Sequence, residues 1–316
     1  MKIKSYSIAN NQGDIVDISN YGARLLKWIT PVNNKPRNIV LGYDKLEDYL
    51  NDPFFIGAIV GPYANRIAHS SCAINGKQLQ LNANEGAHHL HGGSNALANS
   101  LWQCTEHTDN AITLKCVLAD GYNGYPGAMT TEVKYQLTNT SQLTLSINVL
   151  SDNTTIAGPT AHPYFNLGQE NNVNPHYLQL NSQYYTPTDD AGIPQGVIAQ
   201  VEGTRFNYLT SQLISEKTVL DNNFLLSLED SSTHPHLLKH ALLQSNDKQL
   251  SLQVSSNYPA MQVYTGQHLQ CPFRQFQGVC LEPQFCPDSP NQAAFPFHLT
   301  SKQQPLTTQI TYQLEK

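Results

Sequence analysis

The alternation of apolar and polar residues most constrains the fold of this chain. Segments with the two-residue period of a half-buried β-strand recur from end to end, at 111–118, 132–137, 143–149, 250–254 and 308–314. No long stretch shows a helical period. Successive side chains of a strand point to opposite faces of a sheet. The pattern therefore predicts an all-β fold of sheets that each bury one face.

Residues suited to tight turns lie between these segments. Asn75-Gly76, Asp120-Gly121 and Asn123-Gly124 stand where short loops require positive φ. Periodicity alone leaves a sandwich and a barrel open, and we favour a large antiparallel β-sandwich. No linker, charge block or fixed-period repeat divides the 316 residues, so we expect a single domain over 1–316.

Composition excludes several classes of protein. Hydrophobic residues make up 40% of the chain, which is enough to bury a core. The net charge is -6 and Lys and Arg are scattered, so nucleic acid is not an expected partner. The beginning of the chain lacks the apolar core of a secretory signal, and no 18-residue apolar run suits a membrane span. We expect a cytoplasmic protein without a membrane partner.

The six cysteines form no C-x-x-C pair, which argues against a zinc ribbon or a redox dithiol. We expect buried free thiols.

Two Gly-rich segments carry candidate binding residues. In 57–67 (GAIVGPYANRI), Asn65 and Arg66 could donate hydrogen bonds to a ligand, although a plain turn with a surface Arg would look the same. In 84–93 (NEGAHHLHGG), His89 and His91 would share a face of an extended segment. That spacing also suits a metal, but no further ligands stand at familiar spacing, so we favour a hydrogen-bonding His and no metal.

His162 and Glu282 each precede a proline. Within 161–167 (AHPYFNL), the proline biases His162 towards an extended backbone. Within 278–290 (GVCLEPQFCPDSP), Glu282 ends an apolar, strand-like run. A carboxylate at the edge of a buried element is costly without a partner, which points to a function. Alone, each residue has an ordinary structural explanation, as does Asp221 in the turn-like sequence Asp-Asn-Asn-Phe.

Taken in order, these segments resemble the aldose 1-epimerase (galactose mutarotase) family across nearly the whole chain. The matching motifs are GPYANRI to G-R-x-A-N-R-I, HHLHGG to L-H-G-G, AHPYFNL to T-H-P-Y-F-N-L, DNNF to D-x-x-F, YPAMQVYTG to P-x-x-Q-x-Y-T-G, and GVCLEPQ with PDSPN to a strand-Glu-x-Q segment. The resemblance implies the family's supersandwich fold. It also implies seven functional residues, namely Asn65, Arg66, His91, His162, Asp221, Gln262 and Glu282.

The implied reaction interconverts the α and β anomers of free aldohexoses such as glucose or galactose. Glu282 would take the O1 proton as general base and His162 would protonate O5 as general acid, while the other five residues hold the sugar. With reference pKa values of about 4.3 and 6.5, Glu282 would be ionised at pH 7. We expect a nearby carboxylate or ligand to raise the pKa of His162. The cycle resets itself, so no cofactor is expected.

The resemblance departs from the family at two positions and leaves alternatives open. Pro62 stands where many members have Arg, and Ala161 where Thr is common. The rivals are a hexose-6-phosphate 1-epimerase, which needs cationic groups at the pocket mouth, and a glycoside hydrolase using Asp221 and Glu282. A sugar-binding module without activity is the third. The expected partner is a monosaccharide, and the protein is expected to be a monomer or a homodimer.

Overall fold

The computed structural model describes residues 2–168, 170–215, 219–226 and 233–316. Nearly all regular structure in these ranges is β, and the helical segments are short 3-10 turns. They are η1 (Leu46–Asn51), η2 (Ala68–Ser70), η3 (Leu97–Asn99), η4 (Tyr122–Gly124) and η5 (Ser289–Asn291). No helix among the described residues is long and apolar enough to cross a membrane. The all-β prediction is therefore confirmed.

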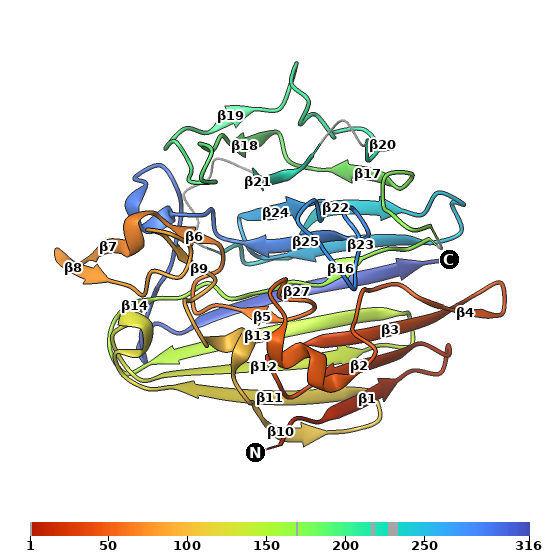
Figure 1. The fold of residues 1–316 in the computed structure, drawn as a ribbon, viewed down its shortest axis with the longest axis horizontal. Coiled ribbons are helices and arrows are strands. Elements are labelled where there is room, and N and C mark those ends of the chain that lie inside the picture. Colours follow the sequence, from red (N-terminus) through yellow and green to blue (C-terminus); the bar gives the residue numbers. More distant parts are fainter. Residues whose placement is uncertain (1, 169, 216–218, 227–232) are drawn as a thin grey trace.

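A nine-stranded antiparallel sheet forms one layer (Figure 1). Its strands, in spatial order, are β10 (Gln103–His107), β11 (Ala111–Leu118), β12 (Met129–Leu137), β13 (Gln142–Ser151), β27 (Leu306–Glu315), β23 (Ser251–Ser256), β22 (Leu238–Gln244), β17 (Tyr177–Leu180) and β20 (Gln212–Leu213). The five segments with alternating residues form β11, β12, β13, β23 and β27, so those strand predictions are confirmed to within two or three residues at most ends.

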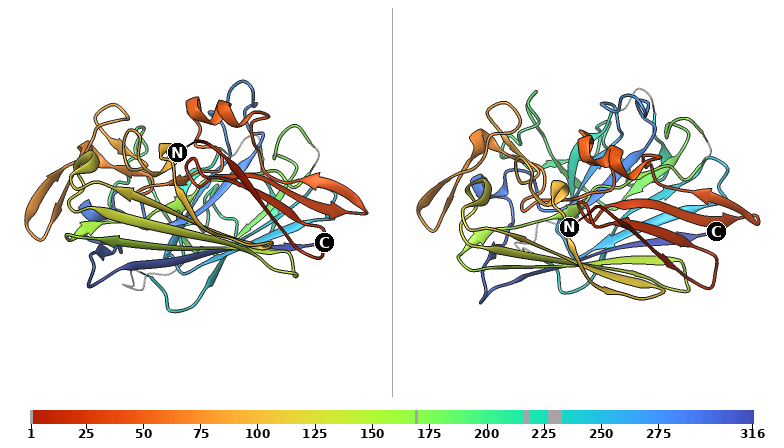
Figure 2. Two further views of the ribbon diagram at one scale, coloured as in Figure 1. Left: turned by 90° about the horizontal axis from the view of Figure 1, so that it is seen from below. Right: turned by 60° about the horizontal axis from the view of Figure 1, so that its bottom comes forward.

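The second layer contains two sheets. A four-stranded sheet consists of β1 (Ser5–Ala9), β2 (Ile15–Ser19), β3 (Leu25–Val32) and β4 (Lys35–Asn38). A six-stranded sheet has the order β16 (Tyr164–Phe165), β25 (Val279–Gln284), β24 (Ala260–Tyr264), β21 (Asp221–Leu225), β18 (Tyr184–Thr186) and β19 (Ala199–Gln200). Viewed from the side, these two sheets lie over the nine-stranded sheet (Figure 2), so the predicted sandwich is confirmed.

Four two-stranded ladders complete the fold: β14 (Thr155–Ile156) with β26 (Leu299–Thr300), β15 (Thr160–Ala161) with β5 (Ile59–Val60), β6 (Arg66–Ile67) with β9 (His89–Leu90), and β7 (Ser71–Ile74) with β8 (Lys77–Gln80). Asn75-Gly76 closes the β7–β8 hairpin with φ of 49° and 75°, the conformation that the sequence predicted for this turn. Gly121, Asn123 and Gly124 also have positive φ.

One hydrophobic cluster fills the space between the layers. It takes Trp28 from the four-stranded sheet, Leu145 and Tyr312 from the nine-stranded sheet, and Val263 and Leu281 from the six-stranded sheet. A core shared by all three sheets supports the single domain over 1–316, which stays a prediction. The six cysteines are unpaired, and Cys72, Cys116, Cys280 and Cys286 are buried as expected, whereas Cys271 is exposed.

Several histidines inside this fold are held neutral. His176 is fully buried, and its Nε2 accepts hydrogen bonds from the backbone N–H groups of Leu167 (3.0 Å) and Gly168 (3.1 Å). An acceptor nitrogen carries no proton. Burial lowers the pKa of His176 to about 4, and burial likewise lowers the pKa of His240 to about 3. Protonation of either side chain therefore destabilises the folded state.

The first prediction concerns stability against pH. Because the folded pKa of His176 lies below the unfolded value of about 6.5, the unfolded chain binds more protons as the pH falls through this window. Stability is therefore complete above about pH 6.5 and is lost towards pH 4. We expect His176 alone to lower the free energy of unfolding by about 2 kcal/mol between about pH 7 and pH 5, measured by urea denaturation.

His176→Gln keeps an acceptor but cannot titrate, so its loss of stability over this range should be smaller. His236→Gln, at an exposed position, serves as the control and should behave as the wild type does. Equal pH dependence in His176→Gln and the wild type would contradict the assignment.

Candidate active site

The floor of the site is the face of the six-stranded sheet that points away from the core. Gln262 lies opposite Glu282 across the β24–β25 ladder, and Asn223 lies opposite Gln262 across β21–β24. The residues that alternate with them, such as Val263 and Leu281, belong to the core. Because side chains alternate between faces, one register places this set of polar groups on the same surface.

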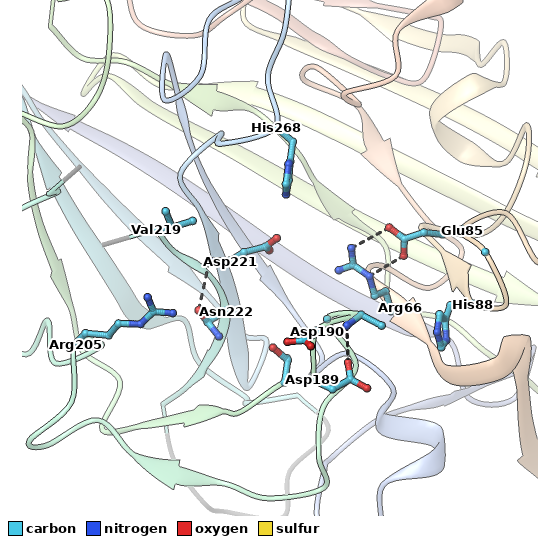
Figure 3. Close-up of a pocket in the computed structure, with 14 residues that line it drawn as sticks. Arg66, Glu85, His88, Asp189, Asp190, Arg205, Val219, Asp221, Asn222 and His268 are labelled. Atoms are coloured by element: carbon cyan, nitrogen blue, oxygen red, sulfur yellow. Dashed lines mark hydrogen bonds and ion pairs between the residues drawn. The ribbon is translucent and has the colours of Figure 1, made fainter. Parts of the chain in front are cut away.

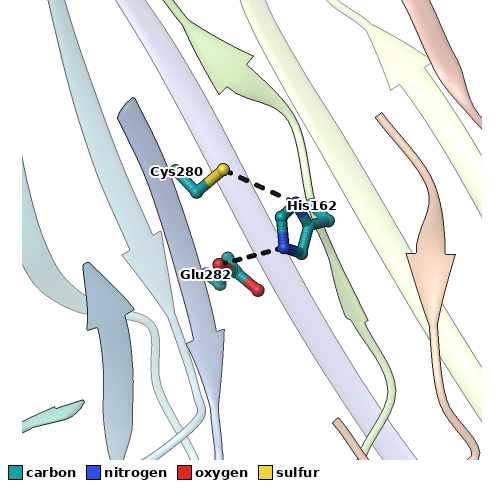
Figure 4. A group of neighbouring side chains, drawn as sticks. All are labelled: His162, Cys280 and Glu282. Carbon is teal, nitrogen blue, oxygen red and sulfur yellow. Dashed lines mark hydrogen bonds and ion pairs between the residues drawn. The ribbon is translucent and has the colours of Figure 1, made fainter. Parts of the chain in front are cut away.

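The same register brings His162 to Glu282. In the β16–β25 ladder Tyr164 pairs with Cys280, so His162, two residues earlier, lies level with Glu282. His162 Nε2 is 3.6 Å from Glu282 Oε1, and the two side chains face each other in Figure 4. Glu282 lies within β25, two residues before its end, which corrects the expectation that it ends the strand.

Backbone contacts hold His162 in place. Its N–H donates to the carbonyl of Ala58 (2.8 Å), and its carbonyl accepts from the N–H of Gly57 (3.0 Å). The Cys280 thiol lies 3.5 Å from His162 Nδ1, whereas Glu282 lies beside the other ring nitrogen (Figure 4). The imidazole therefore has one neighbour at each nitrogen, and its orientation is defined from both ends.

His91 and Asn65 support each other in two loops. Both have left-handed backbones, with φ of 51° and 64°. The Asn65 N–H donates to His91 Nδ1 (3.1 Å), and the His91 N–H donates to the Asn65 carbonyl (3.1 Å). Because Nδ1 accepts, the neutral ring carries its proton on Nε2 and offers a hydrogen-bond donor there.

Arg66 forms a two-pronged ion pair with Glu85. Its Nε lies 2.7 Å from Glu85 Oε2 and its Nη2 lies 2.9 Å from Oε1. Paired in this way, the guanidinium is fixed in the plane of the carboxylate. Nη1 packs against Gly192, where a Cβ would come within 2.9 Å of it. The absence of a side chain at Gly192 makes room for Arg66.

The remaining predicted residues lie on β21 and β24. Asp221 Oδ1 accepts from Gln262 Nε2 at 2.7 Å. Burial raises the pKa of Asp221, although the Arg66 charge and the Gln262 hydrogen bond oppose the shift. Gln262 Oε1 and Glu282 Oε2 are buried without a partner among the described residues. Unpaired polar atoms beside a cavity suit a ligand that supplies hydroxyl groups.

All seven residues predicted from the sequence line one inner cavity of about 180 Å³. A larger outer cavity of about 560 Å³ adjoins it and shares Arg66, Asp221 and His268. Figure 3 shows the outer cavity, with Glu85 against Arg66 on one side and Arg205 on the other. The geometry thus places the predicted set together, while the role of each residue remains to be tested.

The protonation expected for the candidate acid and base is wrong in direction. Burial lowers the pKa of His162 to about 4, and burial, followed by the charge of Asp221, raises the pKa of Glu282 well above its usual range. From the sequence we expected an ionised Glu282 and a raised pKa for His162. Both groups are almost completely shielded from water, and an isolated buried charge is costly. Both shifts favour the uncharged forms, a neutral imidazole beside a protonated carboxyl group.

The expected common face of His89 and His91 is also wrong. The left-handed backbone at His91 breaks the extended geometry. His89 is fully buried, with Nδ1 2.7 Å from the Asn82 carbonyl and Nε2 2.7 Å from the Tyr125 hydroxyl. His89 is thus a satisfied core residue, whereas His91 reaches the cavity.

Among the described residues, one group of side chains could ligate a metal: His162, Cys280 and Glu282, whose ligand atoms lie within 4.8 Å of one another. Burial raises the pKa of the Cys280 thiol well above its usual range. Metals bind the thiolate form, so this environment favours a thiol that hydrogen-bonds over one that ligates. The absence of a metal site stays a prediction.

The two departures from the family pattern lie away from the cavities. The Ala161 side chain belongs to the main core cluster, on the opposite side of the strand from the His162 ring. Pro62 is buried, its carbonyl accepts from the Gly158 N–H (2.8 Å), and it lines neither cavity. Neither departure changes a lining residue.

The sequence did not single out several residues of the site. Glu85 lines the outer cavity and Cys280 lies beside His162, and both stand inside motifs that carry candidate residues. Phe55, Tyr164, Tyr264 and His268 also line the inner cavity. His268 lies on a loop, and no pattern marks it.

The tautomer of His91 gives the second prediction. Burial lowers the pKa of His91 well below its usual value, so the ring should be neutral at pH 7, with its proton on Nε2. Nitrogen-15 NMR of the imidazole should show an unprotonated Nδ1. Titration of His91 near the ordinary histidine value of about 6.5, or a proton on Nδ1, would contradict the geometry.

Comparison with known proteins agrees with this geometry. The family model described as aldose 1-epimerase matches residues 4–313. Aldose 1-epimerase of Escherichia coli K12 is 31% identical over 92% of this chain and 88% of its own length. Galactose mutarotase of Mus musculus is 32% identical over 89% of this chain and 85% of its own length. The solved structure of a GalM/aldose epimerase homologue from C. elegans superposes with a TM-score of 0.93, at 26% identity and 99% coverage of both chains. The chain therefore belongs to the aldose 1-epimerase family.

Proposed function

We propose that this protein is a mutarotase that interconverts the α and β anomers of free aldohexoses such as glucose or galactose. The contact between His162 and Glu282 at the floor of the inner cavity carries the proposal. The reaction needs one group that takes a proton from O1 and another that gives a proton to O5. Glu282 and His162 can fill these two roles, with Oε1 and Nε2 3.6 Å apart.

The protonation states of His162 and Glu282 suit this reaction. Before sugar binds, the shifts favour a neutral His162 and a protonated Glu282. With the ring proton of His162 on Nδ1, the carboxyl proton can pass across the 3.6 Å gap to Nε2, which gives a carboxylate beside an imidazolium. Sugar hydroxyls that hydrogen-bond to the carboxylate stabilise this ionic form. Binding thus prepares Glu282 as base and His162 as acid.

The chemical steps follow from this form. Glu282 takes the O1 proton, His162 delivers its proton to O5, and the C1–O5 bond breaks to give the open-chain aldehyde. Rotation about C1–C2 then presents the other face of the carbonyl to O5. Ring closure returns each proton to its donor, so the pair ends in its starting state. The cycle consumes no water, redox equivalent or cofactor.

The other five residues hold the sugar in place. His91 offers its Nε2–H, and Arg66 adds positive charge that steadies the oxygens as charge develops there. Asn65, Asp221 and Gln262 supply donors and acceptors for the remaining hydroxyls. The Asp221–Gln262 hydrogen bond keeps these two side chains in a fixed relation.

The charge of the outer cavity disfavours a phosphorylated sugar. Among the described residues, four carboxylates, those of Glu85, Asp189, Asp190 and Asp221, line it with two guanidinium groups, those of Arg66 and Arg205. A 6-phosphate would meet net negative charge and a guanidinium already paired with Glu85. A neutral hexose avoids this repulsion. Neither a hydrolase nor a binding module is favoured by relatives named as epimerases and mutarotases.

The proposal extends to the setting of the protein. Six unpaired cysteines suit the reducing cytoplasm. A monosaccharide is the proposed partner, and a monomer or homodimer without nucleic acid is the proposed state.

The third prediction tests the pair by substitution. Glu282→Gln keeps the shape of the side chain but removes the base, and we expect the mutarotation rate measured by polarimetry to fall by about 10³-fold or more. For His162→Asn we expect a comparable loss with sugar binding partly kept. A variant with nearly wild-type rates and an intact fold by circular dichroism would exclude that residue from catalysis.

The fourth prediction concerns the pH profile of kcat/KM. An unperturbed His acid would lose its proton near pH 6.5, and activity would fall above that value. Here Glu282 keeps its proton until its raised pKa is passed, and His162 gains one only near its pKa of about 4. We therefore expect kcat/KM to stay constant as the pH rises from about 5.5 through 6.5. An alkaline fall centred near 6.5 would show that His162 titrates alone.

A further inference from the structure

The loop that follows η1 is wrapped around a buried ion pair. Arg24 Nη1 and Asp52 Oδ2 lie 2.5 Å apart, and both side chains are inaccessible to water. Asp52 also accepts from the backbone N–H groups of Phe54 (2.9 Å) and Ile56 (2.7 Å) and from the Tyr43 hydroxyl (2.9 Å). Arg24 Nη1 donates in addition to the Ile56 carbonyl (2.9 Å). The backbone N–H groups on either side of residue 55 are thus both bound to Asp52.

Phe55 lies between the hydrogen-bonded residues Phe54 and Ile56, and its backbone is strained. Its φ is 56°, in the left-handed region that bulky aromatic residues rarely adopt. Strain of this kind persists where the surroundings hold it, and it gathers at functional sites. The hydrogen bonds of Asp52 to Phe54 and Ile56 are the forces that hold it here.

The strained conformation directs the ring of Phe55 to the inner cavity. Phe55 lines that cavity, and its ring centroid lies 4.9 Å from His91 and 6.0 Å from His162. The ring is only partly buried, so one part of it packs on the histidines and another faces the cavity. It is an apolar surface beside otherwise polar groups.

We propose that Phe55 is a substrate-binding residue whose ring packs against the C–H face of the aldopyranose. The proposal rests on the mutarotase function and adds a contact that the acid–base chemistry does not require. A pyranose presents hydroxyls at its rim and C–H groups on its faces, and the negative face of an aromatic ring attracts such hydrogens. The polar lining residues bind the rim, and Phe55 covers one face.

The ion pair acts on the reaction through this loop. Gly57, directly after the loop, donates to the carbonyl of His162 (3.0 Å). Its φ of 67° and the 2.0 Å approach of the Leu25 carbonyl to a Cβ at this position require glycine. Arg24 and Asp52 are therefore positioning residues for both Phe55 and His162.

Phe276 provides a matched control. It is also a partly buried phenylalanine with positive φ, 59°, and it lines neither cavity. Glycine accepts positive φ without strain, so Phe55→Gly and Phe276→Gly both remove a ring and relieve the backbone. Only the first removes a cavity surface.

The test measures binding separately from turnover. A 1,5-anhydro sugar lacks the anomeric hydroxyl, so it can bind but cannot open, and its Kd is measured by calorimetry. We expect Phe55→Gly to raise this Kd about tenfold and Phe55→Tyr to leave it nearly unchanged. Phe276→Gly should bind as the wild type does. Polarimetric KM values should follow the same order, with kcat changed less than KM.

Two results would overturn the proposal. Unchanged Kd in Phe55→Gly would show that the sugar does not contact the ring. A lower kcat with unchanged Kd would show that Phe55 only supports the histidines. A wild-type protein that binds the anhydro sugar but does not accelerate mutarotation would instead refute the proposed function and leave the contact itself standing.

Discussion

The antiparallel register across β16, β25 and β24 is the constraint on which the site depends. It places His162, Glu282 and Gln262 in one transverse row on the outer face of the six-stranded sheet. A shift of one residue in this register would turn Glu282 into the core and bring Leu281 to the cavity. The same alternation of side chains therefore sets both the packing of the core and the position of the base.

Burial of the row determines its chemistry. His162 and Glu282 have lost nearly all contact with water, so neither a lone imidazolium nor a lone carboxylate is stable there. A neutral imidazole beside a protonated carboxyl group avoids both buried charges. The sugar then supplies the hydroxyls that water would otherwise offer, and it stabilises the ionic form at the moment when acid and base are needed.

The sequence predicted the strands well and the physical state of the candidate site residues poorly. Alternation located β11, β12 and β13 because it reports burial directly, and the family motifs named residues that all reach one cavity. Periodicity could not reveal that Glu85 pairs with Arg66, since their partnership depends on how two loops meet. The direction of the His162 shift was missed because desolvation is a property of the packed surroundings. The left-handed backbones of Phe55 and His91 were missed because neither residue type suggests that conformation.

The central claim is that His162 is neutral and Glu282 is protonated before sugar binds. Difference infrared spectroscopy between the wild type and Glu282→Gln tests it most directly, because the carbonyl stretch of a protonated carboxyl group is separate from the bands of a carboxylate. The account predicts a protonated carboxyl band at pH 7 in the free enzyme that is missing from Glu282→Gln and weakens when sugar binds. A spectrum that shows only ionised carboxylate at Glu282 in the free enzyme would contradict it.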